Sequence, residues 1–350
     1  MLNNQILFPK PQKRKIKRQG KIIQTASYLP ENIISNDDLI RKNNLSLTSE
    51  SVYQSLGVKN RRIAPINLSD SDLLSKAAVK CLENAQILPD QLSRLIITKY
   101  LGDHLMPMTA CMVQRKLKCN FGIHSYDIEG GINSYLEALD MARLYINSGD
   151  EYVLILSGGI HHCHTSKSDT DTLFLFGDGA SATLIGYSEK QHFLSSYFYT
   201  NYNYYDLAKS KISMVESARL PDDIYDTKDF DSIYNSYYLT DWKELIRFYP
   251  NAAKITRDNL LSKSGMDIND VDLVLITENN EQIRSQTLKA IGVQELKGHS
   301  LIQNYGNTMS AMLPLLLDDA MKTKQIHKNQ IIMMLSHGEG ACGGGIIYRI

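Results

Sequence analysis

The sequence lacks the features that mark several classes of protein. Its five cysteines stand at irregular spacings without a CxxC pair, and no apolar signal segment is present, which favours a reducing cytoplasm without a disulfide framework. No apolar run approaches the roughly 18 residues that a membrane helix needs. The formal net charge is +0, so the overall charge gives no reason to expect nucleic-acid binding. These absences indicate a cytoplasmic globular protein with neither a membrane nor a nucleic acid as partner.

The composition is otherwise that of a large folded chain with one unusual segment. The 350 residues, 43% of them hydrophobic, can bury a large core as one domain or as two closely packed halves. Residues 1–19 are different, because they are rich in Lys and Arg. Like charges repel and resist packing, so a solvated N-terminal extension is one interpretation, and a docking arm for an acidic partner is the other.

The chain resembles itself at an offset of 179 residues. The stretch "LSRLIIT" (92–98) matches "VDLVLIT" (271–277), and "VLILSGG" (153–159) matches "IMMLSHG" (332–338) at the same offset. Each half contains short apolar runs, typical of strands buried on both faces, which alternate with helical patterns such as "DLLSKAAVKCLENA". We therefore expect two duplicated α/β halves around a shared core.

Residues 191–250 differ from both halves in composition. They hold ten of the twenty Tyr and the only Trp, Trp242. Tyr clusters complete packed surfaces and also suit interfaces, so we interpret this segment as an insertion or cap. The predicted organisation is an N-terminal extension (1–19), a first half (20–190), the insertion (191–250) and a second half (251–350).

Seven motifs together carry a family resemblance over about residues 20–350. They are, in order, "GKIIQTASYLPENIISNDDL", "SLGVKNRRIA", "HLMPMTACMVQRKL", "YDIEGGINSYLEAL", "LFLFGDGASATLIGY", "QNYGNTMSAMLPLLLDDA" and "LSHGEGACGGGIIYRI". Their order and spacing resemble β-ketoacyl-acyl-carrier-protein synthase III of the thiolase superfamily. The resemblance implies a five-layered α-β-α-β-α fold. It also implies a dimer in which the segment around Met106 reaches the partner's acyl tunnel, and a terminal glycine loop in which Gly340 lines the substrate site.

The same resemblance places the catalytic positions. Such enzymes use a Cys at a strand-turn-helix junction, where the helix N-terminus lowers the thiol pKa, and a His and an Asn that polarise the malonyl thioester. Carried over, the Asn falls on Asn307 in "YGNTMSA" and the Cys on Ile132 in "YDIEGGINSY". The His falls on Glu278, or on Asn279 if a gap slips. One of the three catalytic residues is expected to survive.

Other residues could in principle replace the missing thiol. Ser134 lies two positions along, about half a helical turn away, and is expected to be a helix-start hydroxyl. Cys111 matches a position where the family has a small buried residue, and Cys342 lies in the terminal glycine loop that approaches the reactive centre in relatives. The "HHCH" run (161–164) contains good zinc ligands, but its consecutive spacing argues against a metal, and none is predicted.

Two further points bear on substrate and chemistry. Relatives hold coenzyme A with an aromatic residue and two Arg, whose positions align with Ser51, Thr170 and Ser55, so a substrate on a carrier protein is favoured over coenzyme A and no cofactor is expected. Glu129, three residues before Ile132, could form an acid-base pair with Glu278 whose pKa values mutual repulsion and burial separate, or it could simply face the helix dipole.

Two functions follow as alternatives. The first is a degenerate, non-catalytic synthase III-like subunit of fatty acid or polyketide-type biosynthesis, which forms a homodimer or pairs with an intact homologue, or holds an acyl chain borne on an acyl carrier protein. The second is an acyltransferase or decarboxylase-type enzyme that acts on acyl or malonyl thioesters through Asn307 and Glu278, without an acyl-Cys intermediate. Loss of the nucleophile and base favours the first. Survival of "YGNTMSA" and of the glycine turns favours the second.

Overall fold

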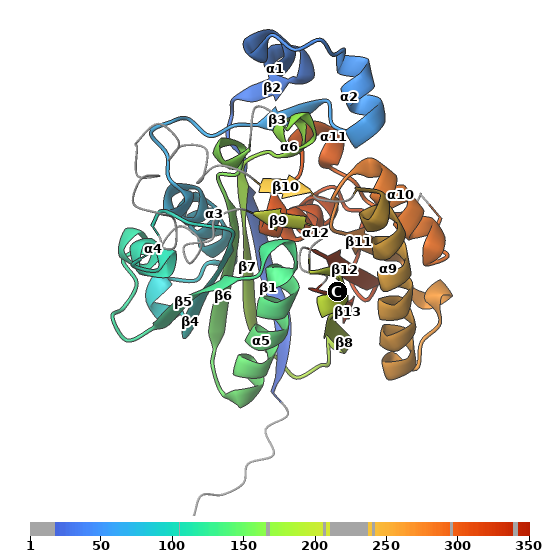
Figure 1. Ribbon diagram of the computed structural model, residues 1–350. Coiled ribbons are helices and arrows are strands. Elements are labelled where there is room, and N and C mark those ends of the chain that lie inside the picture. The colour runs from blue at the N-terminus through green and yellow to red at the C-terminus, as the bar shows by residue number, and fades with distance from the viewer. Residues whose placement is uncertain are drawn as a thin grey trace, which may run out of the picture.

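The computed structural model describes residues 18–104, 106–165, 169–205, 208–210, 237–239, 242–294, 297–338 and 342–350. It contains two principal β-sheets with helices on both sides of each (Figure 1). The predicted basic extension lies outside the described residues, except that the Arg18 guanidinium donates hydrogen bonds to the carbonyls of Ile146 and Asp150 at 3.1 and 2.7 Å. No helix in the described ranges is long and apolar enough to cross a membrane.

The first sheet has five strands in the order β1-β7-β6-β4-β5. β4 is parallel to both β5 and β6, whereas β7 is antiparallel to β6 and to β1. The strands are β1 (Gln19–Tyr28), β4 (Arg94–Lys99), β5 (His124–Glu129), β6 (Tyr152–Gly159) and β7 (Gly179–Ser188). β5 is an edge strand of this sheet, with β4 as its neighbour.

The second sheet repeats this arrangement with four strands in the order β11-β12-β13-β8. β11 and β12 are parallel, and β13 is antiparallel to β12 and to β8. The strands are β8 (Phe193–Thr200), β11 (Leu273–Ile276), β12 (Ile331–His337) and β13 (Cys342–Arg349). Because β4 and β6 correspond to β11 and β12 at the predicted offset, the duplication read from the sequence is confirmed.

Three layers of helices enclose the two sheets. α3 (Asp70–Ala85) and α4 (Thr109–Leu117) cover the outside of the first sheet, and α9 (Trp242–Ser264) and α10 (Glu281–Ala290) cover the outside of the second. Between the sheets lie α5 (Ser134–Ser148) and α12 (Met312–Lys322), whose apolar side chains form one core cluster with both sheets. The predicted five-layered α-β-α-β-α fold is therefore confirmed.

Smaller elements complete the architecture. α1 (Asn36–Asn43) and α2 (Ser49–Leu56) stand with the short pair β2 (Ile33–Ser35) and β3 (Asn60–Arg62) at the top of Figure 1. Also present are α6 (Thr170–Leu175), α11 (Ile302–Tyr305) and the pair β9 (Ala208–Ser210) and β10 (Tyr237–Leu239). The buried Arg61 joins the α1 region to the body, because its guanidinium donates to the side-chain oxygen of Asn36 and to the carbonyl of Phe174.

The second half begins earlier than predicted. β8 falls inside the expected insertion (191–250), yet it pairs along its length with β13 and so belongs to the second sheet. α9 also starts inside that segment and runs on to Ser264. The sequence "FLSSYFYT" is aromatic-rich because it forms a strand covered by α9, since Leu194 and Tyr197 pack against the core cluster there. Much of the remaining insertion lies outside the described residues.

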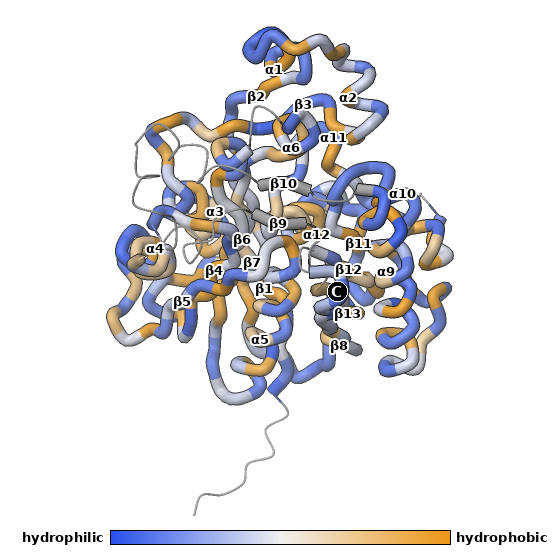
Figure 2. The backbone as a smooth tube through the Cα atoms, viewed as in Figure 1, coloured by the Kyte–Doolittle hydropathy of each residue, from blue (hydrophilic) through white to orange (hydrophobic). Residues whose placement is uncertain are grey.

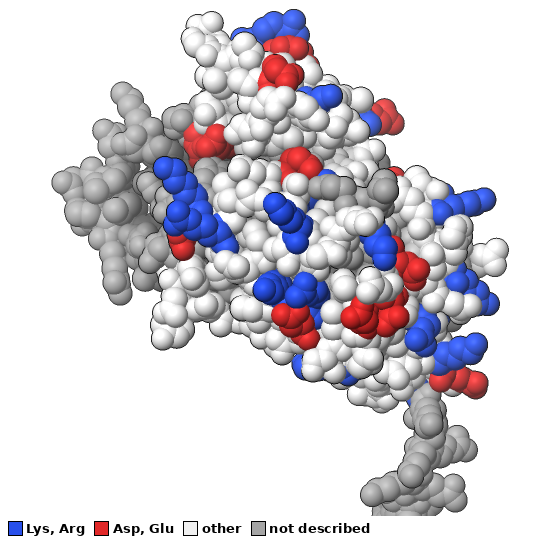
Figure 3. Space-filling model, turned by 90° about the vertical axis from the view of Figure 1, so that its right-hand side faces the viewer, with Lys and Arg blue, Asp and Glu red and all other residues white. Residues whose placement is uncertain are grey.

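The surface over α9 and α10 carries charges of both signs (Figure 3). Lys and Arg side chains are interspersed with Asp and Glu, in keeping with the net charge of +0. Figure 2 shows apolar and polar segments alternating along these outer helices. Such alternation is typical of a helix with one face on a sheet and the other in water.

Candidate functional site

The candidate site is centred on the junction between β5 and α5. The chain leaves β5 at Glu129, passes through Gly130 and Gly131, makes a short 3₁₀ turn η2 (Gly131–Asn133) and enters α5 at Ser134. Gly131 has a φ of 56°, a left-handed conformation that a side chain disfavours. The predicted strand-turn-helix junction is therefore present, with Ile132 in its turn.

Ile132 is buried, with 1% of its surface exposed. Its carbonyl accepts a hydrogen bond from the Ser336 hydroxyl at 3.2 Å. Its side chain lies against Gly338, where an added Cβ would come within 2.5 Å of the Ile132 Cγ2 atom. A side chain at position 338 would therefore clash with Ile132. Ile132 fills the volume between the turn and the chain just after β12.

Asn307 lies between α11 and a second 3₁₀ turn, η8 (Met309–Ala311), which packs against η2. Its side-chain Oδ1 accepts from the Met309 N–H at 2.8 Å, its N–H donates to the Leu175 carbonyl at 2.8 Å, and its carbonyl accepts from the Gly177 N–H at 3.1 Å. Among the described residues, none accepts a hydrogen bond from the amide nitrogen Nδ2 of Asn307. A fixed asparagine with one donor group left over can bind a carbonyl oxygen.

Ser310 connects the segment between α11 and α12, which we call the Asn307 loop (306–311), to the first sheet. Its hydroxyl donates to the carbonyl of Thr98, at the end of β4, at 2.9 Å and accepts from the N–H of Gly158, near the end of β6, at 3.0 Å. The Asn307 loop therefore sits at the carboxyl ends of parallel strands. This is where ligands bind in many α/β sheets.

Glu278 follows β11 and is fully buried. Its Oε2 accepts from the Leu301 N–H at 2.9 Å, and its Oε1 lies 3.9 Å from the Arg284 Nε. Burial raises the pKa of the Glu278 carboxyl from 4.5 to about 7, against opposing hydrogen bonds from Ser300 and Leu301. The neighbouring Asn279 donates weakly from Nδ2 to the His337 carbonyl, at 3.5 Å.

Glu129 has different surroundings, and the predicted pairing with Glu278 needs correction. The Glu129 side chain is 66% exposed and lies 3.1 Å from the Nζ atom of the buried Lys99, which is also 3.5 Å from Asp127. The carboxylate that acts on the pKa of Glu278 is Glu281, and burial is the dominant cause of its shift. Mutual repulsion with Glu129 is therefore not what raises this pKa. Catalytic roles for Glu129, Glu278 and Asn307 stay predictions.

Of the two predicted substrate-binding residues, the structure describes only Met106. Met106 is 83% exposed in the segment before α4, where the nearby Met108 is also exposed. Gly340 lies outside the described residues, as do the positions on either side of it. The reach of Met106 into a partner's tunnel remains a prediction.

The alternative nucleophiles have ordinary environments. Ser134 is buried and its hydroxyl donates to the Gly131 carbonyl at 2.7 Å, as expected of a helix-start hydroxyl. Cys111, predicted to be buried, is instead exposed on α4, because it lies on the helix face that points away from the sheet. Cys342 is partly buried at the start of β13.

The predicted loss of coenzyme A binding rests on three positions, Ser51, Ser55 and Thr170. Ser51 and Ser55 are both exposed on α2, and Ser51 forms part of the capping box of that helix with Thr48. Thr170 is the first residue of α6. Neither the aromatic stack nor the guanidinium that would hold an adenine is supplied at these positions.

The "HHCH" run forms hydrogen bonds within the protein. Asp178 of "FGDGASA" accepts from the N–H groups of His161 and His162 at 2.8 and 3.1 Å, and its Oδ2 lies 2.6 Å from Nδ1 of His162. Within the described ranges, no group of three or more His, Cys, Asp and Glu side chains could hold a metal ion. Asp178 thus fixes this segment at the end of β6.

Sequence reasoning missed His337, which is buried at the end of β12. Its Nδ1 lies 3.0 Å from the Tyr199 hydroxyl, and burial lowers the pKa of His337 to about 3. Its neighbours in sequence, Ser336 and Gly338, both contact Ile132. The signal was available, because His337 in "LSHG" replaces Gly158 in the matching "LSGG" of the first half.

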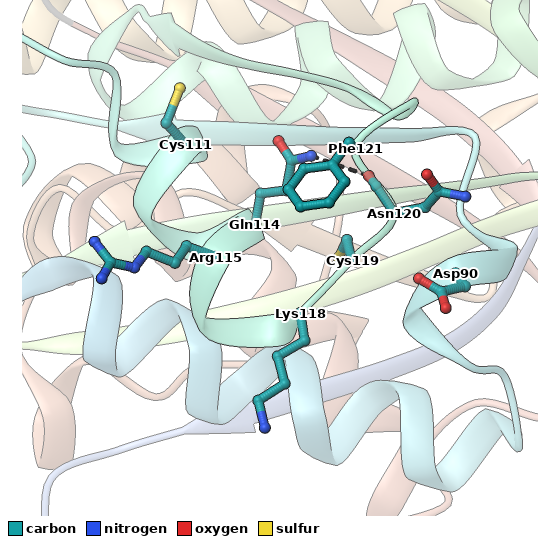
Figure 4. Close-up of a pocket in the computed structure, with 8 residues that line it drawn as sticks. All are labelled: Asp90, Cys111, Gln114, Arg115, Lys118, Cys119, Asn120 and Phe121. Carbon is teal, nitrogen blue, oxygen red and sulfur yellow. Dashed lines mark hydrogen bonds between the residues drawn. The ribbon is translucent and has the colours of Figure 1, made fainter.

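A cavity of about 680 Å³ lies away from the junction between β5 and α5 (Figure 4). Its walls come from α4, from the chain after it and from Asp90, with Phe121 fully exposed and Gln114 donating to the Asn120 carbonyl. The lining includes none of the residues at the strand-turn-helix junction. We therefore do not assign it to the candidate site.

Comparisons with known proteins point to one family. The family model described as 3-oxoacyl-[acyl-carrier-protein] synthase III matches residues 126–201, and the model described as its C terminal part matches residues 261–350. A β-ketoacyl-[acyl-carrier-protein] synthase III of Neisseria gonorrhoeae is 29% identical over 331 residues, which cover 94% of this chain and 99% of the relative. One from Coxiella burnetii is 26% identical over 333 residues, covering 95% and 99%.

Solved structures agree with these matches. The crystal structure of 3-oxoacyl-[acyl-carrier-protein] synthase III from Aquifex aeolicus VF5 is 26% identical, with a TM-score of 0.83 over 95% of this chain and 100% of that one. The priming β-ketosynthase from the R1128 polyketide biosynthetic pathway has the same fold, with a TM-score of 0.86 at 19% identity, over 97% and 99% of the chains. The duplicated five-layer architecture and these matches show a synthase III-like protein with the thiolase fold.

Proposed function

We propose that this chain is a non-catalytic synthase III-like subunit that holds a carrier-bound acyl chain in fatty acid or polyketide-type biosynthesis. The observation that carries the proposal is Ile132, an apolar, buried side chain in the turn before α5. An acyl-enzyme needs a nucleophilic atom at this kind of position, and an isoleucine offers none.

The nearest hydroxyl groups also support the proposal. The Ser134 hydroxyl donates to the carbonyl of Gly131, and the Ser336 hydroxyl donates to the carbonyl of Ile132. Each hydroxyl proton is therefore directed at the backbone of the turn. Neither has a described histidine or carboxylate as a hydrogen-bond partner to remove its proton, which activation of a serine requires.

Intact-mass spectrometry tests the loss of the acyl-enzyme. After incubation with butyryl-charged acyl carrier protein, the unmodified protein should show no acyl adduct, whereas Ile132→Cys restores a thiol beside a helix N-terminus and serves as the positive control. One stable acyl group per unmodified chain would refute the proposal. The holding role needs a second readout, namely saturable binding of the fluorescently labelled butyryl carrier protein, and absence of such binding would remove it.

The second candidate, an enzyme without an acyl-Cys intermediate, is favoured by one observation. Asn307 keeps Nδ2 as a donor, and Glu278 has a pKa near 7, so part of it is protonated at neutral pH and could also donate. Two donors could stabilise the enolate that forms when a malonyl thioester loses carbon dioxide. Conversion of malonyl-charged to acetyl-charged carrier protein, abolished by Asn307→Ala, would establish this function in place of the first.

We also propose that two chains associate through the first sheet. β5 is an edge strand with the exposed side chains of Met106, Met108 and Phe121 in the chain on either side of α4. An open edge beside exposed apolar residues suits pairing with a second copy or with an intact synthase III homologue. Light scattering at micromolar concentration should give the mass of a dimer, and a monomer with and without the homologue would contradict it.

A further inference from the structure

A small recess adjoins the Asn307 loop and is distinct from the Ile132 turn. Its walls are Tyr100, His161, His164, Phe176 and Met309. Tyr100 follows β4, and the two histidines follow β6. Phe176 follows α6, and Met309 lies in η8, so four separate segments converge here. We call this the His161 recess.

Several polar atoms at the recess are buried without hydrogen-bond partners among the described residues. They are both ring nitrogens of His161 and Nδ1 of His164, and the hydroxyl oxygen of Thr308, next to the lining residue Met309 in sequence, is also unpaired. Only 4% of the His161 surface is exposed. The Thr308 backbone approaches the His161 ring without completing a hydrogen bond of normal geometry. Buried polar groups are normally paired, so this concentration of unpaired atoms indicates a missing partner.

The position of His161 is fixed by its backbone. Asp178 accepts hydrogen bonds from the N–H groups of both His161 and His162, and it also binds the His162 ring. The His162 ring is therefore paired within the protein, whereas the adjacent His161 lines the recess with neither ring nitrogen paired among the described residues. A side chain held in this way is preorganised to bind a ligand.

The recess is continuous with the candidate site. Met309, which lines it, donates its N–H to the side chain of Asn307, and Thr308 stands between them in sequence. Phe176, on another wall, is paired through the backbone with Asn307. A group bound in the recess would therefore lie beside Asn307.

The chemistry of the walls restricts the ligand. Burial lowers the pKa of His161 to about 4 and also lowers that of His164, so both rings are neutral at physiological pH. A neutral imidazole offers one donor and one acceptor, which matches a hydroxyl group that both donates and accepts. The recess has a volume of about 10 Å³, which is room for one water-sized group such as a hydroxyl, and Tyr100, Phe176 and Met309 supply apolar surface around it. A water molecule could satisfy the same nitrogens, and a ligand hydroxyl would displace it.

We propose that the His161 recess binds the hydroxyl group of a hydroxylated acyl chain, so that the protein selects such chains over plain alkyl ones. This inference rests on the proposed function as a holder of acyl thioesters, and it specifies the acyl group. The neutral rings and the apolar walls exclude a charged group. Recognition of a hydroxyl by buried polar atoms rejects the analogue without it, because those atoms are then left unpaired.

Calorimetric titration with two matched pairs of probes tests the inference. The first pair is the S-pantetheine thioesters of 3-hydroxybutyrate and butyrate, and the second is 3-hydroxybutyramide and butyramide, which have no thioester. The unmodified protein should bind the hydroxylated member of each pair about tenfold more tightly or better. His161→Leu should abolish the preference. His192→Leu, which removes another buried histidine, just before β8 and bonded to the Arg349 carbonyl of β13, should retain it.

The outcomes separate the two proposals. If the thioesters bind equally well and His161→Leu changes nothing, the recess inference is wrong and the acyl-holding function stands. If only the amides bind, with a preference that depends on His161, the recess inference stands and the thioester function fails. If no probe distinguishes the hydroxyl group, or none binds, the recess inference is refuted.

A crystal structure of the unmodified protein with 3-hydroxybutyramide covers the case in which His161→Leu does not fold. The ligand hydroxyl should lie within about 3.2 Å of a His161 ring nitrogen. An ordered water alone in the recess, with the ligand elsewhere, would overturn the inference. His161→Gln, which keeps a donor and an acceptor, should retain part of the preference and provides a second variant for titration.

Discussion

The two halves of the molecule enter their inner-layer helices through similar turns that carry different residues. In the first half Gly131, with a φ of 56°, precedes Ile132, and in the second half Met309, with a φ of 52°, follows Asn307. Each turn is a single 3₁₀ turn that leads directly into α5 or α12. Ala311 stands at the duplication offset from Ile132, so a small buried residue in the second turn corresponds to the larger isoleucine in the first.

This difference shows how polar groups are distributed between the halves. The first turn has an apolar side chain packed on Gly338, while the second has an amide with a spare donor and a recess with unpaired imidazole nitrogens beside it. Hydrogen-bonding groups at the site therefore come from both halves, His161 and His164 from the first and Asn307 from the second, whereas Ile132 supplies only shape. Three substitutions break or sharpen this comparison.

The largest effect is expected for Ile132→Ala. Removal of a fully buried side chain between the turn and Gly338 should lower the free energy of unfolding by about 2–4 kcal/mol, through lost transfer energy and a residual cavity. Chemical denaturation measures it. Ile255→Ala, at a half-exposed position on α9, is the matched control and should cost well under 1 kcal/mol. An equally small loss for Ile132→Ala would mean that this side chain does not fill the turn.

A smaller, pH-dependent effect is expected for Glu278→Gln. The folded-state pKa of Glu278 is raised from 4.5 to about 7, so the folded protein binds the proton more tightly than the unfolded chain does. The contribution of this group to stability is therefore full below about pH 4.5, falls as the pH rises through 4.5 to 7, and stays lost above 7. Glutamine keeps an acceptor for the Leu301 N–H without ionising.

The Glu278→Gln variant should accordingly be more stable than the unmodified protein at pH 8, by on the order of 2 kcal/mol, and the gain should shrink toward pH 5. Denaturation curves across this range measure the gain. Glu129→Gln, at an exposed position, should give a pH dependence like that of the unmodified protein. A Glu278→Gln gain that is independent of pH would show that Glu278 does not ionise in this window.

The smallest effect is expected for Gly131→Ala. A side chain at a φ of 56° costs about 1 kcal/mol, since the left-handed conformation crowds the Cβ atom. Thermal denaturation measures the loss. Gly122→Ala, at an exposed position with negative φ where an added Cβ makes only an ordinary contact with the Asn120 side chain, is the control and should be nearly neutral. If both variants behave alike, Gly131 does not define the turn.

The sequence predicted the fold well because the fold depends on periodicity and repetition. The matches at a fixed offset mark β4, β6, β11 and β12, and those strands are where they were expected. β8 was assigned to an insertion because its Tyr and Phe residues resemble an interface segment. The strand is aromatic for another reason, which is that it packs under α9, and that contact is made by residues distant in sequence.

The site was less predictable because its chemistry depends on side-chain neighbours. For Glu129 the sequence left open a pair with Glu278 or an orientation toward the helix dipole, and it did not reveal the contact with Lys99, which no motif includes. His161 was considered only as a metal ligand within "HHCH", since nothing in the run reveals that the His162 ring pairs with Asp178 whereas the His161 ring has no described partner. His337 was missed because a single polar residue in an apolar strand gives no periodic signal, and only its difference from Gly158 at the matching position of the first half marks it.

The shared inner layer has a consequence for biosynthesis of the chain. Its core cluster combines Tyr135 and Leu139 of α5 with Met312 and Leu316 of α12, so neither half can bury this face alone. The ribosome completes the first half about 160 residues before the C-terminus, and at usual elongation rates the nascent first half waits roughly 10–30 s with its apolar inner face uncovered. The nascent chain is therefore expected to be a chaperone client, and rare codons in the second half would lengthen its exposure to aggregation.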